Sequence, residues 1–406
     1  MPPPAVVLAA GEGTRVRPFT TTEPKVMLPV ANRPILEHVL LALRGAGVRE
    51  IALIVGYKHE RVRDAIGDGR KLGVRVSYVL QKQQLGTAHA LKAARAHVQG
   101  PTLVLNGDNL VEAEALRDLL RKPEGEMSIL AIRREGASRR SLVVEGGRVR
   151  KIRPGGTTHE GEPVNTGVYL VTPAIFKHIG ALDLSYRGEY ELIDAIERAI
   201  DRGADVRARV TGHGWHEIVT PWDLLRVNGL VLDREAAGWT RGGRAPRGVE
   251  PGAHLQGPVA VGPGSRIRAG STILGPVLIG ANCDIGPHAA LLPGTSVGDG
   301  CRVGPFAHLR NSILMEEVEV EAHAHMVNSV AGRHARIGPG VHLESGRATV
   351  GAEGAPREAE LGALVGEGAS VGDRALVAAG RVLGVRSRVG AGAVVRQDVP
   401  DGALVL

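Results

Sequence analysis

Residues 7–29 read VLAAGEGTRVRPFTTTEPKVMLP. The apolar run Val6–Ala10 enters this stretch, and its composition predicts a buried central β-strand. Gly11 and Gly13 follow at once, so the backbone can turn sharply and direct its N–H groups at phosphate oxygens. The stretch therefore predicts an α/β domain with a phosphate-binding loop after its first strand.

Two positively charged side chains, Arg15 and Lys25, complete this loop and suit a triphosphate. The loop differs from two familiar phosphate-binding loops. A Walker loop has Gly-Lys-Ser/Thr after its second glycine, whereas Thr14 and Arg15 follow Gly13 here. A dinucleotide fingerprint has a third small residue at position 16, where this chain has Val16.

The chain has 406 residues, two cysteines and a formal net charge of +7. Its length favours two domains, and its charge suits anionic substrates. The positive residues are not gathered into a tract with aromatic residues, so we expect no nucleic-acid partner. The start of the chain has no charged-then-apolar leader, and no apolar run reaches about 18 residues. We therefore expect a cytoplasmic protein without a membrane partner.

The first half of the chain alternates apolar strands with helical patterns, as open α/β sheets do. The expected strands are Ile51–Val55, Val74–Val79, Thr102–Leu105 and Met127–Ile132. The expected helices are Pro34–Ala46, Thr87–Val98, Ala113–Arg121 and Tyr190–Arg202. Ligands of such sheets bind at the carboxyl ends of the strands.

The second half has a six-residue repeat of apolar side chains, which predicts a parallel β-helix. In such a helix each hexad forms one short side and three hexads form one triangular coil. The repeat positions are Val261, Ile267, Ile273, Ile279, Ile285, Leu291, Val297, Val303, Leu309 and Met315, and then Val365, Val371, Val377, Leu383, Val389 and Val395. Cys283 and Cys301 each lie four residues after a repeat position, so we expect both to point inward as small core residues.

The loop followed by hexads resembles the bifunctional N-acetylglucosamine-1-phosphate uridylyltransferase/glucosamine-1-phosphate acetyltransferases, in the style of the archaeal sugar-1-phosphate nucleotidyltransferases. The resemblance implies a Rossmann-like nucleotidyltransferase domain over residues 1–235, a linker over 236–252 and a left-handed β-helix over 253–406. It also implies a homotrimer, or a higher homo-oligomer, assembled through the β-helix. The nucleotide contacts that it implies in the loop are Leu8, Ala10, Gly11, Gly13 and Thr14, with Arg15 and Lys25 as catalytic residues.

The resemblance assigns further segments to the base and to a metal ion. Gln81 is expected to hydrogen-bond a pyrimidine edge, with the backbone of Gly86 and Thr87 against the base. Asp108 ends a buried strand in Asn-Gly-Asp and is expected to bind Mg²⁺, which prefers hard oxygen ligands. Glu217 stands where the family has a second carboxylate, and Asn228 is the weaker alternative.

Asn165 and Thr166 match the family's sugar-binding Asn-Thr-Gly. Two departures concern the sugar pocket: Ser141 stands where the family usually has glycine, and Arg153 lies where an acidic residue is usual. The resemblance implies transfer of a nucleotidyl group from UTP or dTTP to N-acetylglucosamine-1-phosphate or glucose-1-phosphate, with pyrophosphate as the other product.

The second half leaves an acetyltransferase activity open, with acetyl-CoA as co-substrate. Counted without a gap, the family's catalytic histidine falls on Ala322, so His323 and His325 are displaced candidates. Arg310 resembles a sugar-phosphate ligand of that activity. A non-catalytic regulatory subunit of the same architecture is a further alternative, although the retained loop residues and Asp108 argue against it.

Overall fold

The computed structural model describes residues 2–121, 124–133, 140–154, 161–185, 188–239, 248–352 and 355–406. Contacts divide the chain into two compact units. The first is made of Met1–Gly13, Glu23–Met27 and Pro34–Glu217, and the second of Thr14–Thr22, Leu28–Arg33 and Ile218–Leu406. The predicted linker 236–252 lies partly outside the described residues.

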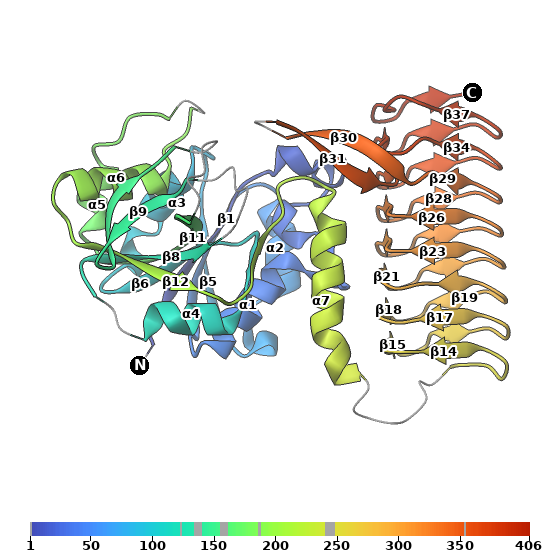
Figure 1. The fold of residues 1–406 in the computed structure, drawn as a ribbon, viewed down its shortest axis with the longest axis horizontal. Coiled ribbons are helices and arrows are strands. Elements are labelled where there is room, and N and C mark those ends of the chain that lie inside the picture. The colour runs from blue at the N-terminus through green and yellow to red at the C-terminus, as the bar shows by residue number, and fades with distance from the viewer. Residues whose placement is uncertain are drawn as a thin grey trace. The chain divides into compact units, whose positions relative to one another are not determined.

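The first unit is an α/β sandwich (Figure 1). Its helices are α1 (Ile35–Gly45), α2 (His59–Ile66), α3 (Thr87–Ala93), α4 (Ala113–Leu120), α5 (Ile175–Ile179) and α6 (Leu192–Asp201). Its strands are β1 (Ala5–Ala9), β4 (Glu50–Val55), β5 (Arg75–Leu80), β6 (Thr102–Asn106), β7 (Asn109–Val111), β8 (Met127–Arg133), β9 (Leu142–Glu145), β10 (Arg148–Ile152), β11 (Pro163–Val171), β12 (Val206–Thr211) and β13 (Trp215–Glu217). Short 3₁₀ turns η3 (Lys25–Met27), η4 (Arg70–Leu72) and η5 (Arg95–His97) complete it.

The nine-stranded main sheet has the order β5-β4-β1-β6-β11-β8-β12-β10-β9. Strand β1 is buried along its whole length and pairs in parallel with β4 and β6. Its side chains alternate between two apolar clusters, Val6 and Leu8 in one and Val7 and Ala9 in the other. This alternation is what a strand covered on both faces requires. The predicted α/β fold is confirmed.

The strands and helices expected from the sequence are present, with one clear difference in length. The helix expected over Thr87–Val98 ends at Ala93, and a 3₁₀ turn over Arg95–His97 follows it. Ala94 has left the helical region at φ −90° and ψ 15°, which ends the ladder of hydrogen bonds there.

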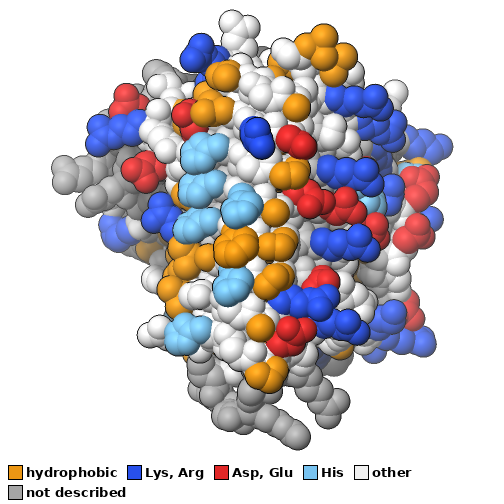
Figure 2. Space-filling view, turned by 90° about the vertical axis from the view of Figure 1, so that its right-hand side faces the viewer, with side chains coloured by type: hydrophobic (Ala, Val, Ile, Leu, Met, Phe, Trp, Pro, Cys, Tyr) orange, Lys and Arg blue, Asp and Glu red, His pale blue; other side chains and the backbone are white. Residues whose placement is uncertain are grey.

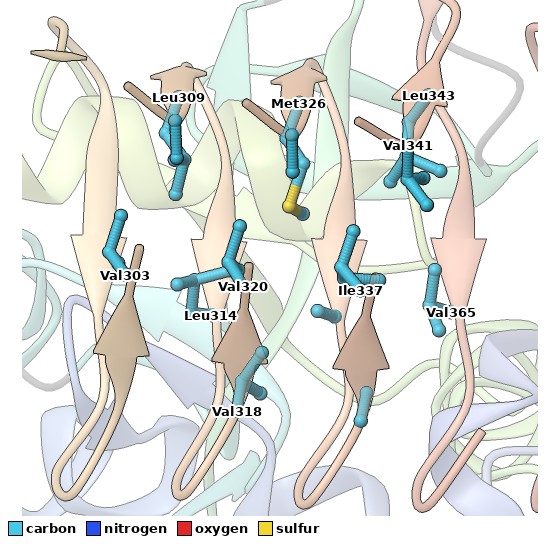
Figure 3. Close-up of a cluster of buried hydrophobic side chains, with 14 of the residues drawn as sticks. Val303, Leu309, Leu314, Val318, Val320, Met326, Ile337, Val341, Leu343 and Val365 are labelled. Carbon is cyan, nitrogen blue, oxygen red and sulfur yellow. The ribbon is translucent and has the colours of Figure 1, made fainter. Parts of the chain in front are cut away.

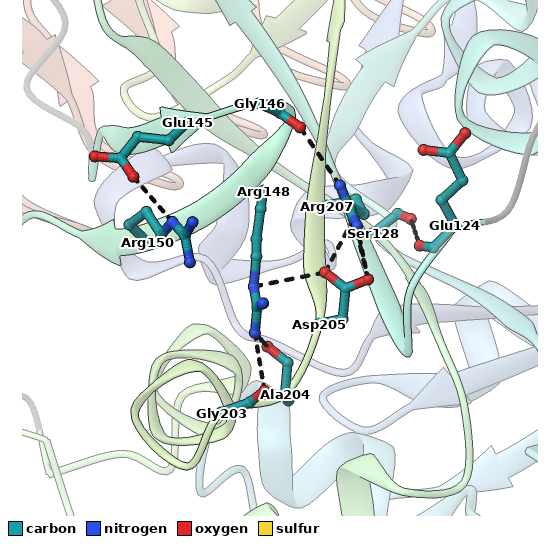
Figure 4. A network of polar contacts seen from close by, with 10 residues as sticks. All are labelled: Glu124, Ser128, Glu145, Gly146, Arg148, Arg150, Gly203, Ala204, Asp205 and Arg207. Carbon is teal, nitrogen blue, oxygen red and sulfur yellow. Dashed lines mark hydrogen bonds and ion pairs between the residues drawn. The ribbon is translucent and has the colours of Figure 1, made fainter.

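Ion pairs stabilise the sheet edge formed by β12, β10 and β9 (Figure 4). Asp205 lies 2.9 Å from Arg207 and 3.6 Å from Arg148, and Arg150 lies 3.0 Å from Glu145. These pairs are partly exposed, so each adds little to stability. None of the helices in the described part of the chain is long and apolar enough to cross a bilayer.

The second unit contains α7 (Asp223–Trp239), the short strands β2 (Pro29–Val30) and β3 (Arg33–Pro34), and a parallel β-helix of three sheets. The sheet we call the His face consists of β14 (His254–Gln256), β17 (Thr272–Leu274), β20 (Ala290–Leu291), β23 (His308–Arg310), β26 (His325–Val327), β29 (His342–Leu343), β34 (Leu376–Val377) and β37 (Val394–Val395). The helix face consists of β15 (Val259–Val261), β18 (Val277–Ile279), β21 (Thr295–Val297), β24 (Ile313–Leu314), β27 (Val330–Ala331), β32 (Leu364–Val365) and β35 (Val382–Leu383). The charged face consists of β16 (Arg266–Ile267), β19 (Asp284–Ile285), β22 (Arg302–Val303), β25 (Glu319–Val320), β28 (Arg336–Ile337), β33 (Ser370–Val371), β36 (Arg388–Val389) and β38 (Leu404–Val405).

The repeat side chains other than Met315 lie in, or for Val261 against, one continuous apolar core, part of which Figure 3 shows. The prediction that Cys283 and Cys301 are core residues is confirmed, because both are buried in this cluster. Burial raises the pKa of the Cys301 thiol to about 12. A thiol with so high a pKa forms almost no thiolate at neutral pH and is inert.

One predicted repeat position is wrong. Val297 pairs with Leu314 rather than with Met315, because the coil between them is one residue shorter than its predecessor. The shorter corner turns at Asn311, which has φ +43°, and its side chain donates to Asn328 Oδ1 at 2.7 Å. Asn328 donates in turn to Ser345 Oγ at 2.7 Å, so the short corners are stacked on one another.

A two-stranded antiparallel hairpin, β30 (Gly346–Ala352) and β31 (Ala355–Leu361), leaves the β-helix directly after Ser345. It does not interrupt the inward stack, since Ala331 pairs directly with Val365 across the insertion.

The three faces of the β-helix differ in what they expose. Outward residues of the charged face alternate in sign over Arg302, Glu319 and Arg336, as solvated pairs do. On the helix face Ile313 and Val330 are buried, and α7 packs against this sheet. The His face carries stacked rings instead. In Figure 2 the histidines form a column, and Arg, Asp and Glu side chains lie to the right of it.

The histidine stack consists of His308, His325 and His342, with ring centroids 4.9 Å and 4.6 Å apart. Burial lowers the pKa of His308 and of His325, and the neighbouring charge of Arg310 lowers both further. For His325 the charges of His342 and His308 also contribute. The folded chain therefore disfavours protons in this stack.

We predict that this stack makes the β-helix less stable as the pH falls from about 7 to about 5. In that window the unfolded chain binds more protons than the folded one, so the free energy of unfolding rises with pH. The double variant His308→Asn/His325→Asn should flatten the change of melting temperature with pH, and His254→Asn on the same face serves as control. An unchanged pH profile in the double variant would contradict the prediction.

Candidate active site

The loop after β1 packs tightly at Gly13. Gly13 has φ +74°, and a Cβ atom there would lie 2.6 Å from Lys25 Cβ, so only glycine fits. Gly11 is different, because it is exposed and a Cβ added to it would meet no atom of the described residues within 4 Å. The fold therefore requires Gly13, whereas nothing in the surrounding packing requires Gly11.

Lys25 and Asp108 form the central ion pair, with Nζ 2.6 Å from Oδ2. Lys25 opens the turn η3, and Asp108 follows the end of β6. Gly107 N donates to Leu8 O at 2.8 Å, which extends the β1–β6 pairing up to the loop. Asp108 keeps 26% of its side chain exposed while Lys25 keeps 9%, so the carboxylate is the more exposed partner of the pair.

Glu217 lies opposite Asn109, the residue that follows Asp108, because β13 pairs antiparallel with β7. The described residues contain no cluster of three or more His, Cys, Asp or Glu side chains that could hold a metal. Two carboxylates from paired strands still fit Mg²⁺, since this ion commonly takes one or two protein carboxylates and completes its shell with phosphate oxygens and water. Asn228, the weaker alternative, does not fit: its amide accepts from Ala31 N and Ser296 Oγ and donates to Gly294 O.

The segment expected to read the base is built on buried contacts. Gln81 is 4% exposed, and its Nε2 donates to Gly86 O at 3.2 Å and lies 3.0 Å from His89 Nδ1. Gly86 has φ +103°, and a Cβ there would lie 2.5 Å from Tyr190 O. Thr87 Oγ1 accepts from Leu192 N at 2.8 Å and so caps α6. The contact of the Thr87 backbone with a base stays a prediction.

The segment Asn165-Thr166-Gly167 is an irregularity in β11, where pairing with β8 is interrupted between Asn165 and Tyr169. Asn165 Nδ2 donates to Tyr169 Oη at 2.9 Å, and its Oδ1 accepts from Gly167 N at 3.0 Å. Thr166 is fully buried and donates to Leu130 O, so its side chain serves the fold rather than a sugar.

Sequence reasoning missed Glu162, which joins the two departures noted at the sugar pocket. Ser141 Oγ donates to Glu162 Oε2 at 2.6 Å, and Arg153 Nε donates to Glu162 Oε1 at 3.0 Å. Neither the periodicity nor a motif marks this carboxylate, because it precedes a strand and faces residues about ten and twenty positions earlier.

Arg140, next to Ser141, was also missed. It forms ion pairs with Asp194 and Glu191, at the start of α6. Burial alone would lower the pKa of Arg140, but the hydrogen bond and charge of Asp194 outweigh it and raise the pKa. Through α6 this pair connects the base segment at Thr87 with the sugar segment.

The remaining predicted residues lie as follows. Leu8 and Ala10 are buried in the core under the loop. Thr14 and Arg15 are exposed in a 3₁₀ turn, Thr14–Val16, that groups with the second unit. Their part in nucleotide binding stays a prediction.

The acetyltransferase candidates lie on the β-helix. His323 occupies a corner with φ +59°, and its ring stacks on Phe306 at 5.0 Å. His325 is the middle ring of the histidine stack, and its Nδ1 is buried with no hydrogen-bond partner among the described residues. Arg310 is exposed at the end of β23.

Comparison with known proteins adds an independent finding. A model of the nucleotidyl transferase family matches residues 4–234, and one of the GMPPB C-terminal domain matches residues 273–391. The chain is 33% identical over 270 residues to the glucose-1-phosphate thymidylyltransferase of Streptomyces griseus, covering 65% of this chain and 74% of that protein. It is 30% identical over 413 residues to the bifunctional protein GlmU of Methanococcus maripaludis, covering 99% and 96%.

The UTP–glucose-1-phosphate uridylyltransferase AglF of Haloferax volcanii is 34% identical over 236 residues, covering 56% of this chain and 90% of that protein. Among solved structures, a Bacillus anthracis chain assigned as a glucose-1-phosphate thymidylyltransferase matches with TM-score 0.50 and 25% identity, covering 56% of this chain and 94% of that one. Because the first family model alone spans more than half of the 406 residues, the chain belongs to the nucleotidyl transferase family.

Proposed function

We propose that the chain transfers a nucleotidyl group from UTP or dTTP to a sugar-1-phosphate, giving a nucleotide sugar and pyrophosphate. The observation that carries the proposal is the Lys25–Asp108 pair at 2.6 Å, located at the carboxyl ends of β1 and β6 beside a glycine loop. The named activities of the relatives from Streptomyces and Haloferax support the same reaction class.

In this reaction a phosphate oxygen of the sugar-1-phosphate attacks the α-phosphorus of the nucleotide. A new P–O bond forms there while the bond to the leaving pyrophosphate breaks, and both electrons of that bond go to pyrophosphate. The nucleophile is already an anion, so the protein needs no general base. Its contribution is alignment and stabilisation of negative charge by Lys25, by Arg15 and by the N–H groups of the glycine loop.

Asp108 and Glu217 are the residues that would hold Mg²⁺. Bound there, the ion would neutralise charge on the triphosphate. Lys25 also contacts Asp108, so an ion held by this carboxylate would lie beside the lysine ammonium group.

Gln81 favours a base that offers an N–H group. Its Nε2 already donates to Gly86 O, so Oε1 is the atom we assign to the base edge. Uracil and thymine present an N3–H donor to such an acceptor, which supports UTP or dTTP.

We further propose that residues 1–235 act as the catalytic domain and residues 253–406 as a scaffold that assembles a homotrimer. Support comes from the His face. Its middle strands present His308, His325 and His342 side by side, and none of these three positions is acidic. Phe306 at its corner is 53% exposed. A face of stacked rings beside an exposed aromatic side chain suits contact with a second copy.

The experiment that tests the function measures pyrophosphate release by the full chain over a matrix of four nucleoside triphosphates and several sugar-1-phosphates, with Mg²⁺. Turnover with UTP or dTTP and glucose-1-phosphate or N-acetylglucosamine-1-phosphate is expected. A parallel arm with acetyl-CoA and glucosamine-1-phosphate should release negligible CoA, because Ala322 cannot act as a base. CoA release abolished by His323→Ala or His325→Ala would favour the bifunctional alternative.

We predict that Asp108→Asn lowers Mg²⁺-dependent turnover by at least about 100-fold while the melting temperature changes little. The substitution removes a ligand charge but leaves an oxygen that Lys25 can contact. Asp64→Asn, an exposed substitution on α2, serves as the control and should keep wild-type turnover. Normal turnover in Asp108→Asn would exclude this residue as a metal ligand.

The two loop glycines should separate stability from binding. Gly13→Ala should lower the free energy of unfolding by more than about 1 kcal/mol, because of its positive φ and the contact with Lys25. Gly11→Ala should keep wild-type stability but raise KM for the triphosphate, since its methyl group would occupy the phosphate's space. Thermal melts and steady-state kinetics on both variants check this, and an unchanged KM in Gly11→Ala would refute the contact.

Light scattering on the full chain should give a mass three times that of the 42.7 kDa chain. Phe306→Asp should lower that mass, because it adds a charge to the proposed contact and aspartate tolerates the corner's φ of +58°. A monomeric mass for the wild-type chain would contradict the proposed trimer.

A further inference from the structure

A buried asparagine on α7 joins an early turn of the chain to the β-helix. Asn228 is fully buried, and its side-chain amide makes three hydrogen bonds. Its Oδ1 accepts from Ala31 N at 2.8 Å and from Ser296 Oγ at 3.0 Å. Its Nδ2 donates to Gly294 O at 3.1 Å. One side chain therefore ties the backbone of the turn to β21 and to the glycine that precedes this strand.

The turn makes a second contact with the same strand. It links β2 to β3, and its two central residues, Ala31 and Asn32, have φ of +46° and +57°. Positive φ at both central residues is what a two-residue hairpin turn of type I′ requires, and alanine is uncommon there. Asn32 Nδ2 donates to Val297 O at 2.6 Å. The unusual backbone is therefore held both directly by β21 and through Asn228, as strained segments need to be.

Lys25 lies a short way before this turn, on a segment that is packed throughout. It opens the turn η3, which Met27 N closes by donating to Pro24 O at 2.8 Å. The side chains from Lys25 to Leu28 are buried, and β2, which follows at once, packs against α7. We therefore expect a shift of the turn to reach Lys25 along the chain.

We propose that Asn228 is a positioning residue for the reaction, because it holds the turn Ala31-Asn32 against β21 and thereby sets the place of the Lys25 ammonium group. This inference rests on the proposed function, in which Lys25 stabilises negative charge on the triphosphate. Displacement by about 1 Å, caused by a change far from the reacting atoms, can lower turnover roughly 100-fold. A coil of the β-helix thus contributes to nucleotidyl transfer, and this contribution needs no contact between the β-helix and either substrate.

The competing explanation is that Asn228 only stabilises the packing of α7 on the β-helix. Removing a buried hydrogen-bonding side chain destabilises the fold in either case, so a melting temperature cannot separate the two explanations. Turnover can separate them. A chain that is destabilised but still folded at the assay temperature keeps the wild-type kcat, whereas a displaced Lys25 lowers kcat in the folded chain.

The experiment compares two test variants with one control, each at a temperature where its thermal melt shows it to be folded. Asn228→Ala removes all three amide bonds, whereas Asn32→Gly removes only the bond to β21 and suits the φ of +57°. The control Ser265→Ala removes another buried hydroxyl of the β-helix, which donates to Gly280 O at 2.6 Å and accepts from Cys283 N at 2.9 Å. Pyrophosphate release is measured with the triphosphate and the sugar-1-phosphate that the wild type uses best.

Both test variants should lower kcat, Asn228→Ala by roughly 10- to 100-fold and Asn32→Gly by less, while KM for the sugar-1-phosphate stays unchanged. Ser265→Ala should keep the wild-type kcat even where its melting temperature falls. Adding Asn228→Ala to Lys25→Ala should lower kcat no further, because a residue that acts through Lys25 has no effect once the ammonium group is gone.

Three outcomes would overturn the inference: wild-type kcat in both folded test variants, an equal fall of kcat in Ser265→Ala, or a further loss in the double variant. If Asn228→Ala does not fold, the kcat of Asn32→Gly against that of Ser265→Ala decides. A wild-type chain that releases no pyrophosphate with any pair of substrates would instead refute the proposed function itself.

Discussion

The structure of the first unit around its loop depends on one contact, the 2.6 Å pair between Lys25 and Asp108. Lys25 Cβ fills the space beside Gly13, and Asp108 follows a strand that pairs with β1. The pair thus joins two segments 83 residues apart in the chain. Replacing Gly13 with any other residue would push Lys25 away. The position of the lysine charge therefore depends on the glycine at this turn.

A chain of partly buried polar contacts connects the segment expected to read the base with the segment expected to bind the sugar. Thr87 caps α6 through Leu192 N, Arg140 pairs with Asp194 and Glu191 near the start of that helix, and Ser141 follows Arg140 in the chain. Ser141 then donates to Glu162. The segments expected to bind the base and the sugar are therefore both attached to α6. This attachment sets the spacing between the two segments without involving the loop after β1.

Sequence reasoning succeeded where short-range patterns determine the structure. The strand-and-glycine stretch and the six-residue repeat each predict a local conformation, and both are present. It failed at Met315, because a corner that is one residue shorter changes the register without changing the composition. It also missed Glu162. The contacts of this carboxylate with Ser141 and Arg153 depend on how distant strands pair, and no local sequence pattern encodes that pairing. Asn228 was expected as an alternative metal ligand, yet its amide oxygen and nitrogen are hydrogen-bonded to Ala31, Ser296 and Gly294.

The division of contacts has a consequence for how this chain can be cut or recombined. Segments Thr14–Thr22 and Leu28–Arg33 group with the second unit, although they interrupt the loop that carries Gly13 and Lys25. Phe19 in the first of these segments is buried, and Ala31 in the second hydrogen-bonds to Asn228 of α7. Severing the chain near residue 235 would keep Asn228 with Ala31 but remove Gly294 and Ser296, which Asn228 also contacts. The two units are thus interleaved in sequence, and a domain exchange that respects the fold has to carry the early segments along with the β-helix.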